Sequence, residues 1–227
     1  MGKTRAWRQA GVKVLLGALG VAACLPLKGC VIGALVGGMT ESYRQNSTRP
    51  IDAKYTGVEG KSFAVVVSAD RIIQADYPDA VALLTVRISE RLKEHINATG
   101  YVPGERVLEY QYNNPRWVAM SMSDLAKALG VERLVFIDVQ ELRLNDPGNQ
   151  YLWAGVATGT VGVVEADGPM ADIYSFQEAV SVAFPDGESF GQGEMSAPLV
   201  QAALVKRFVD RASWLFYTHE EPYYPEY

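Results

Sequence analysis

Residues 63–68 form a short apolar run that can fold in few ways. They read Phe-Ala-Val-Val-Val-Ser, with three consecutive β-branched valines and no charged side chain. A continuous apolar segment of this length is typical of a β-strand that is buried on both faces. Because each face must then be covered, the run predicts a layered domain in which helices pack on a sheet.

A long amphipathic helix is predicted between Asp79 and Ile96. Pro78 suits a helix start, and Gly100 and Pro103 stop the helix. Apolar residues recur in this segment at spacings of three and four, which places them on one helix face: Val81, Leu84, Ile88, Leu92 and Ile96. This face is expected to pack on the sheet.

Further strands are predicted at residues 107–112, 133–139, 151–165 and 173–184. The last two are joined by the turn at residues 166–169 and are expected to form an antiparallel hairpin. Alternation in the final strand places these side chains on one face: Tyr174, Phe176, Val180, Val182 and Phe184. This face is expected to be covered, and the opposite face to be open to solvent.

Two more helices complete the predicted order β-α-β-α-β-β-β-α. The first covers residues 123–129, follows the capping pattern Ser121-x-x-Asp124 and ends at Gly130. The second starts near Ser196, which is a suitable cap. The predicted fold class is therefore α/β, an α+β sandwich in which helices pack on a mixed sheet of about five strands.

The first 30 residues have the pattern of an export signal. Lys3, Arg5, Arg8 and Lys13 form a basic start, and no charged residue occurs at positions 14–27. This 14-residue run is shorter than the roughly 20 apolar residues that a membrane-spanning helix needs, so it indicates a signal peptide. An uncleaved signal anchor, with a lysine at the membrane interface, is the alternative.

Both cysteines of the chain lie at the end of this segment. Residues 27–30, Leu-Lys-Gly-Cys, resemble a bacterial lipobox, in which a small residue precedes a cysteine that becomes lipidated and N-terminal; Cys30 would carry the lipid. Residues 21–24, Val-Ala-Ala-Cys, resemble one too, so Cys24 is the alternative site. Other interpretations are an ordinary cleaved signal and free thiols in an uncleaved helix. Attached acyl chains would hold the folded part on a bilayer.

Charge is distributed unevenly between this leader and the remainder. Residues 1–30 hold five Lys or Arg residues and no acid, which leaves 16 basic and 26 acidic side chains elsewhere. The acidic remainder disfavours a nucleic-acid partner. The predicted organisation is a lipoprotein-type signal peptide at 1–29, a lipid-anchored tether at 30–60, a single α/β domain at 61–217 and a flexible Pro/Tyr tail at 218–227.

Residues 124–130, Asp-Leu-Ala-Lys-Ala-Leu-Gly, and the strand at 131–139 resemble a helix–glycine–strand segment of small bacterial envelope domains. These are the TolB N-terminal, LpoB-like and CsgG-like domains, and the resemblance spans residues 61–217. It implies periplasmic lipoproteins that regulate cell-wall synthases, assist envelope assembly or oligomerise into export channels. The expected location is the bacterial cell envelope, facing the periplasm, with the outer membrane favoured over the inner one.

Carboxylates and histidines do not form a convincing catalytic set, so the chain is predicted not to be an enzyme. Asp70, Asp76 and Asp138 are the candidates for a carboxylate-dependent hydrolase, the less favoured alternative. His95 is expected at the surface in the last turn of its helix, and His219 in the tail. Two isolated histidines predict no metal site, and no cofactor is expected.

Aromatic residues instead indicate protein binding. Tyr110, Tyr112 and Trp117 flank a turn, and Tyr223 and Tyr224 lie near the C-terminal end. Tyr and Trp are enriched where proteins meet. We therefore expect a membrane-anchored lipoprotein that binds another envelope protein, which it assists or regulates. A structural subunit of an export or surface assembly is the alternative, and the sequence leaves the oligomeric state open.

The intact mass of the protein purified from membranes tests the interpretation of the leader. We expect a chain that begins at a lipidated Cys30 and is heavier than its amino-acid sequence by the attached acyl groups. A chain that begins at Cys24 would assign the alternative site. An unprocessed chain without lipid would contradict the prediction.

Overall fold

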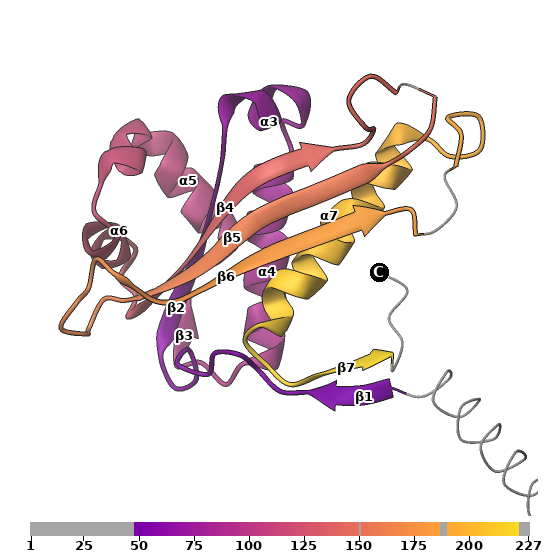
Figure 1. Cartoon of the computed structure of the whole chain (residues 1–227). Helices are drawn as coiled ribbons and strands as arrows, with labels where there is room; N and C mark the ends of the chain where they lie inside the picture. The colour runs from indigo at the N-terminus through magenta and orange to yellow at the C-terminus, as the bar shows by residue number, and fades with distance from the viewer. Residues whose placement is uncertain (1–47, 150, 187–189, 223–227) are drawn as a thin grey trace, which may run out of the picture. The chain divides into compact units, whose positions relative to one another are not determined.

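A computed structural model describes residues 48–149, 151–186 and 190–222 of the chain (Figure 1). The elements are β1 (Thr48–Ile51), β2 (Ser62–Ala69), α3 (Arg71–Asp76), α4 (Ala80–His95), β3 (Gly100–Tyr101), α5 (Gly104–Asn113), η1 (Pro115–Ala119), α6 (Met122–Leu129), β4 (Arg133–Arg143), β5 (Gly155–Glu165), β6 (Tyr174–Phe184), α7 (Ala197–Trp214) and β7 (His219–Pro222). Residues 50–220 belong to one unit, and the described residues 48–49 and 221–222 to another.

A five-stranded mixed sheet in the order β3-β2-β4-β5-β6 forms the middle of the larger unit. Strand β2 runs parallel to β3 and β4, whereas β4, β5 and β6 pair antiparallel. Helices pack on this sheet, which confirms the predicted α/β class. Strands β1 and β7 pair with each other in a separate two-stranded sheet.

Strand β2 is buried on both faces, as the apolar run predicted. Val65, Val66 and Val67 are each 0% exposed. On one face, Val65 belongs to a core with Ile88 of α4 and Phe208 of α7. On the other face, Val66 belongs to a second core, which includes residues of α5 and α6. Helices α4 and α7 thus lie on one face, and α5 and α6 on the other.

The amphipathic helix and its neighbours follow their local signals closely. Helix α4 spans Ala80–His95 and buries Leu84, Ile88 and Leu92, as predicted. At the start of α6, Ser121 Oγ accepts a hydrogen bond from the Asp124 amide at 3.2 Å. Gly130 ends α6 with a φ of 72°, a left-handed conformation that favours glycine. Ser196 stands at the N-cap of α7, but its side chain makes no capping hydrogen bond.

Residues 107–112, predicted as a strand, instead belong to helix α5, so that prediction was wrong. Val107 is buried, and Tyr110, one helical turn later, packs against the same core. A six-residue alternation is too short to separate a strand from a helix, because one apolar pair at a spacing of three satisfies the helical period. The short strand β3 comes before this helix, at Gly100–Tyr101, where no strand was predicted.

The β5–β6 hairpin is antiparallel as predicted, with one correction at Tyr174. Val163 pairs with Phe176, but Val164 pairs with Tyr174, so β6 has an extra residue between these pairs. Such a bulge reverses the facing of the side chains that follow it. Phe176 therefore packs in the α4–α7 core, whereas Tyr174 packs in the α5–α6 core.

An ionic network fastens the start of β4 to the turn after β5. The Arg133 side chain is 8% exposed and forms an ion pair with Asp167. Its Nε donates to the Gly57 carbonyl at 2.9 Å, and Lys61 Nζ donates to Asp167 at 2.8 Å. The hydrogen bonds from Lys61 and Arg133 lower the pKa of the Asp167 carboxyl from 3.8 to about 2.

Helix α5 approaches α4 so closely that only glycine fits at its first position. A Cβ on Gly104 would lie 2.6 Å from the Val86 Cα and 2.9 Å from the Val86 nitrogen. We expect Gly104→Ala to lower the free energy of unfolding by ~1–3 kcal/mol in a urea titration, because backbone atoms must move. Gly100→Ala is the matched control, since its nearest atom would be 4.0 Å away. Equal stabilities of the two variants would contradict the close approach.

The Asp167 network predicts a loss of stability in acid. A carboxyl whose folded pKa lies below its unfolded value stabilises the fold above about pH 4 and loses this effect as the pH falls towards 2. We expect Asp167→Asn to reduce the free energy of unfolding at pH 7 by about 1 kcal/mol, since the carboxylate is partly exposed. The difference from the original protein should shrink between pH 4 and 2. Asp124→Asn, at an exposed pair with Lys127, should show little of either effect.

Candidate functional site

Three of the five aromatic residues predicted to bind a partner, Tyr110, Tyr112 and Trp117, lie on α5 and η1. Together with Val118 of η1 they make up what we call the α5–η1 surface. Tyr112 is 85% exposed and Val118 is 69% exposed. Tyr110 and Trp117 are partly buried against the α5–α6 core, and the Tyr110 hydroxyl lies 3.5 Å from Met120 Sδ. Tyr112 thus faces solvent, whereas Tyr110 and Trp117 pack towards the α5–α6 core.

A groove of about 470 Å³ runs along the base of α5, between this helix and the end of α6. Tyr110, Pro103 and Leu129 supply apolar wall, and Asn113 and Asn114 supply amides. The surface therefore combines an exposed aromatic residue with a neighbouring depression.

Other predicted site residues fall outside the described part of the chain. These are the lipid-attachment candidates Cys30 and Cys24 and the tail residues Tyr223 and Tyr224. Their predicted roles stay predictions.

The acidic candidates for catalysis lie at the two ends of α3 and on β4, the central strand of the sheet. Asp70 caps α3, where its Oδ1 accepts a hydrogen bond from the Ile73 amide at 2.8 Å. Asp76 is exposed at the end of α3, and Asp138 is exposed on β4. The capping bond gives Asp70 a structural role.

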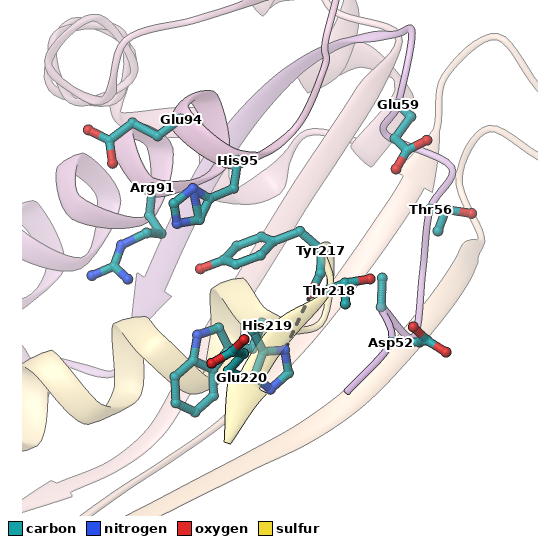
Figure 2. Close-up of a pocket in the computed structure, with 12 residues that line it drawn as sticks. Asp52, Thr56, Glu59, Arg91, Glu94, His95, Tyr217, Thr218, His219 and Glu220 are labelled. Atoms are coloured by element: carbon teal, nitrogen blue, oxygen red, sulfur yellow. Dashed lines mark hydrogen bonds between the residues drawn. The ribbon is translucent and has the colours of Figure 1, made fainter. Parts of the chain in front are cut away.

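A second site brings together both histidines of the chain, which the sequence pattern placed in a helix and a tail. We call it the histidine pocket (Figure 2). It has a volume of about 860 Å³ and is lined by the last turn of α4, the segment after α7 and residues 52–59. His95 is exposed at the end of α4, as predicted, and His219 comes from the other wall.

Four rings of the histidine pocket contact one another in series, from His95 at the end of α4 to Trp214 at the end of α7. We call this series the ring ladder. The His95 and Tyr217 rings meet edge to face, with centroids 4.3 Å apart and an interplanar angle of 80°. The His219 ring stacks on the Trp214 ring, with centroids 4.4 Å apart and an interplanar angle of 6°. The centroid of the His219 ring lies 6.5 Å from that of Tyr217. The His219 Nδ1 lies 3.3 Å from the Tyr217 carbonyl oxygen. These contacts hold the rings in a defined arrangement.

The charged residues of the histidine pocket are mostly acidic. Asp52, Glu59, Glu94 and Glu220 line it together with one cation, Arg91. The guanidinium of Arg91 is engaged by Asp210 at 3.1 Å. Among the described residues, no group of three or more His, Cys, Asp or Glu side chains could hold a metal ion.

The sequence signal for the histidine pocket is weak but present. Three ring-bearing residues, Trp214, Tyr217 and His219, follow one another closely around the end of the predicted last helix. Such a concentration of rings indicates a surface that could bind a ligand. Nothing in the sequence pairs this end with His95, because that contact depends on the packing of α4 against α7. The pocket could therefore be found only from the tertiary structure.

Comparisons with known proteins give structural similarity alone. No family model and no curated protein matches the chain. Among solved structures, the chain is similar to the dodecamer of a PelC variant from Paraburkholderia phytofirmans (10% identity, 75% of this chain and 99% of that chain, TM-score 0.43). It is also similar to Lipoprotein GNA1162 from Neisseria meningitidis (14% identity, 66% of this chain and 95% of that chain, TM-score 0.42). A further similar structure is XCC0632 from Xanthomonas campestris (12% identity, 71% of this chain and 83% of that chain, TM-score 0.36). At these values the similarity transfers no function to this chain.

Proposed function

We propose that this chain is a non-enzymatic envelope lipoprotein that binds another envelope protein through the α5–η1 surface. The observation that carries the proposal is the exposure of Tyr112 and Val118 on adjacent elements, which the partly buried Tyr110 and Trp117 attach to the α5–α6 core. A large exposed aromatic residue on a rigid support contributes much contact area at little entropic cost.

The rigidity of the support comes from three neighbours of α5. Its first residue, Gly104, lies against α4, and Val107 is buried in the α5–α6 core. Asn114 continues from α5 into η1, where its side-chain amide donates to the Tyr110 carbonyl at 2.9 Å. A partner would thus meet a preformed surface, which reduces the ordering cost of binding.

Anchoring at the envelope is supported by the leader sequence. A lipid on Cys30, or on Cys24, would hold the α/β domain beside a membrane and raise its concentration near envelope partners. In the described residues, every helix is too short or too polar to cross a bilayer. The resemblance to TolB N-terminal, LpoB-like and CsgG-like domains supports a periplasm-facing location, at the outer membrane.

Site-specific photocrosslinking in living cells tests the proposal. A photoreactive phenylalanine analogue at position 112 of the lipidated protein should crosslink one discrete envelope protein, because this side chain faces solvent. The same analogue at Ile72, which is 70% exposed on α3, is the matched control and should give no such product.

The variants Tyr112→Ala and Val118→Asp add a quantitative test. We expect each to weaken retention of the crosslinked partner at least about tenfold, as for a central contact residue. Thermal unfolding should change little, since both side chains are exposed. Identical crosslinks from positions 112 and 72, or unchanged retention by both variants, would refute the role of this surface.

A further inference from the structure

We propose that the histidine pocket is a second binding site and that it takes an organic cation, a primary ammonium or guanidinium group. This site is separate from the α5–η1 surface and does not depend on the function proposed for that surface. Its volume of about 860 Å³ lies in the usual range of small-ligand sites and leaves ample room for an amino-acid side chain or a short polyamine. All of its lining residues lie in the unit of residues 50–220.

The charges of the pocket favour a positive ligand. Three of its carboxylates, Asp52, Glu59 and Glu94, form no salt bridge with the lysines and arginines of the described chain. Arg91 is held by Asp210, which also accepts from Lys206 at 2.8 Å. An anionic ligand would therefore face several carboxylates with little compensation, whereas a cation would be attracted by them.

The ring ladder supplies the second component of cation recognition. Faces of Trp and Tyr rings attract ammonium and guanidinium groups within about 6 Å. Trp214 already makes this interaction, since the guanidinium of Arg211 lies 5.4 Å from its ring centroid and His219 stacks on the ring. The ligand would therefore meet Tyr217 rather than Trp214. Tyr217 stands between the two imidazoles, and its hydroxyl lies 3.4 Å from Ser213 Oγ. Aromatic and acidic side chains in one pocket are the combination that binds organic cations.

The rings and the carboxylates that line the pocket come from several different segments of the chain. In Figure 2, the Tyr217 ring lies beside His95 and extends away from the segment that holds Asp52 and Glu59. Asp52 and Glu59 lie on that segment, and Glu94 lies on α4. Carboxylates thus come from two of the segments that line the pocket.

Titration of the full-length protein in detergent with two cationic probes tests the proposal. The probes are spermidine and the blocked tripeptide Ala-Lys-Ala, and the neutral control is the same peptide with an acetylated lysine. We expect saturable calorimetric binding of a cationic probe, with shifts of the His95 and His219 imidazole signals in NMR spectra. Acetylation should abolish binding, and raising NaCl from 50 to 200 mM should weaken it. Tighter binding of the tripeptide would identify a protein side chain as the source of the cation. Tighter binding of spermidine would identify a free polyamine as the source.

Matched variants locate the site. Glu59→Gln and Glu94→Gln should each weaken binding of the preferred probe by about tenfold, because each removes a charge from the pocket. Glu105→Gln, on the first turn of α5, should leave the affinity unchanged. All three variants should unfold at the temperature of the original protein. Absence of saturable binding, equal affinity for the acetylated peptide, or unchanged affinity in both pocket variants would overturn the proposal.

Discussion

The burial of β2 on both faces is the constraint on which the rest of the structure depends. A strand with fully buried valines on each side is stable only if two layers of helix cover it. Its parallel pairing with β4 then requires a crossover connection, which α3, α4, α5 and α6 provide. Helices α4 and α7 complete one layer, and α5 and α6 the other.

Each layer presents one of the two surfaces to which we assign binding. The α5–η1 surface belongs to the layer of α5 and α6, where Gly104 lets α5 start against α4. The histidine pocket belongs to the other layer, where α4 ends beside the segment that follows α7. Both surfaces lie at helix ends, where the backbone leaves the layer and side chains of different segments converge.

Much of the fold could be predicted because its strongest signals are local. The valine run, the α4 stripe, the Ser121 cap and Gly130 each depend on a few neighbouring residues. The strand predicted at residues 107–112 was wrong because two apolar side chains at a spacing of three fit a helix as well as a strand. Tyr174 was assigned to the wrong face because a one-residue bulge in β6 leaves no mark on the alternation. Of the candidate site, sequence identified Tyr112 as an aromatic residue beside a turn, but it could not separate it from the partly buried Tyr110.

By itself, the sequence determined the basic leader with its two cysteines, the acidic remainder and the α/β class, because these follow from composition and short-range periodicity. Only the tertiary structure decided which aromatic side chains face solvent and which residues share a pocket. His95 and His219 are 124 positions apart, and their approach depends on α4 packing against α7 over the same face of the sheet. Such long-range contacts arise from the burial of both helices together, which no local pattern encodes.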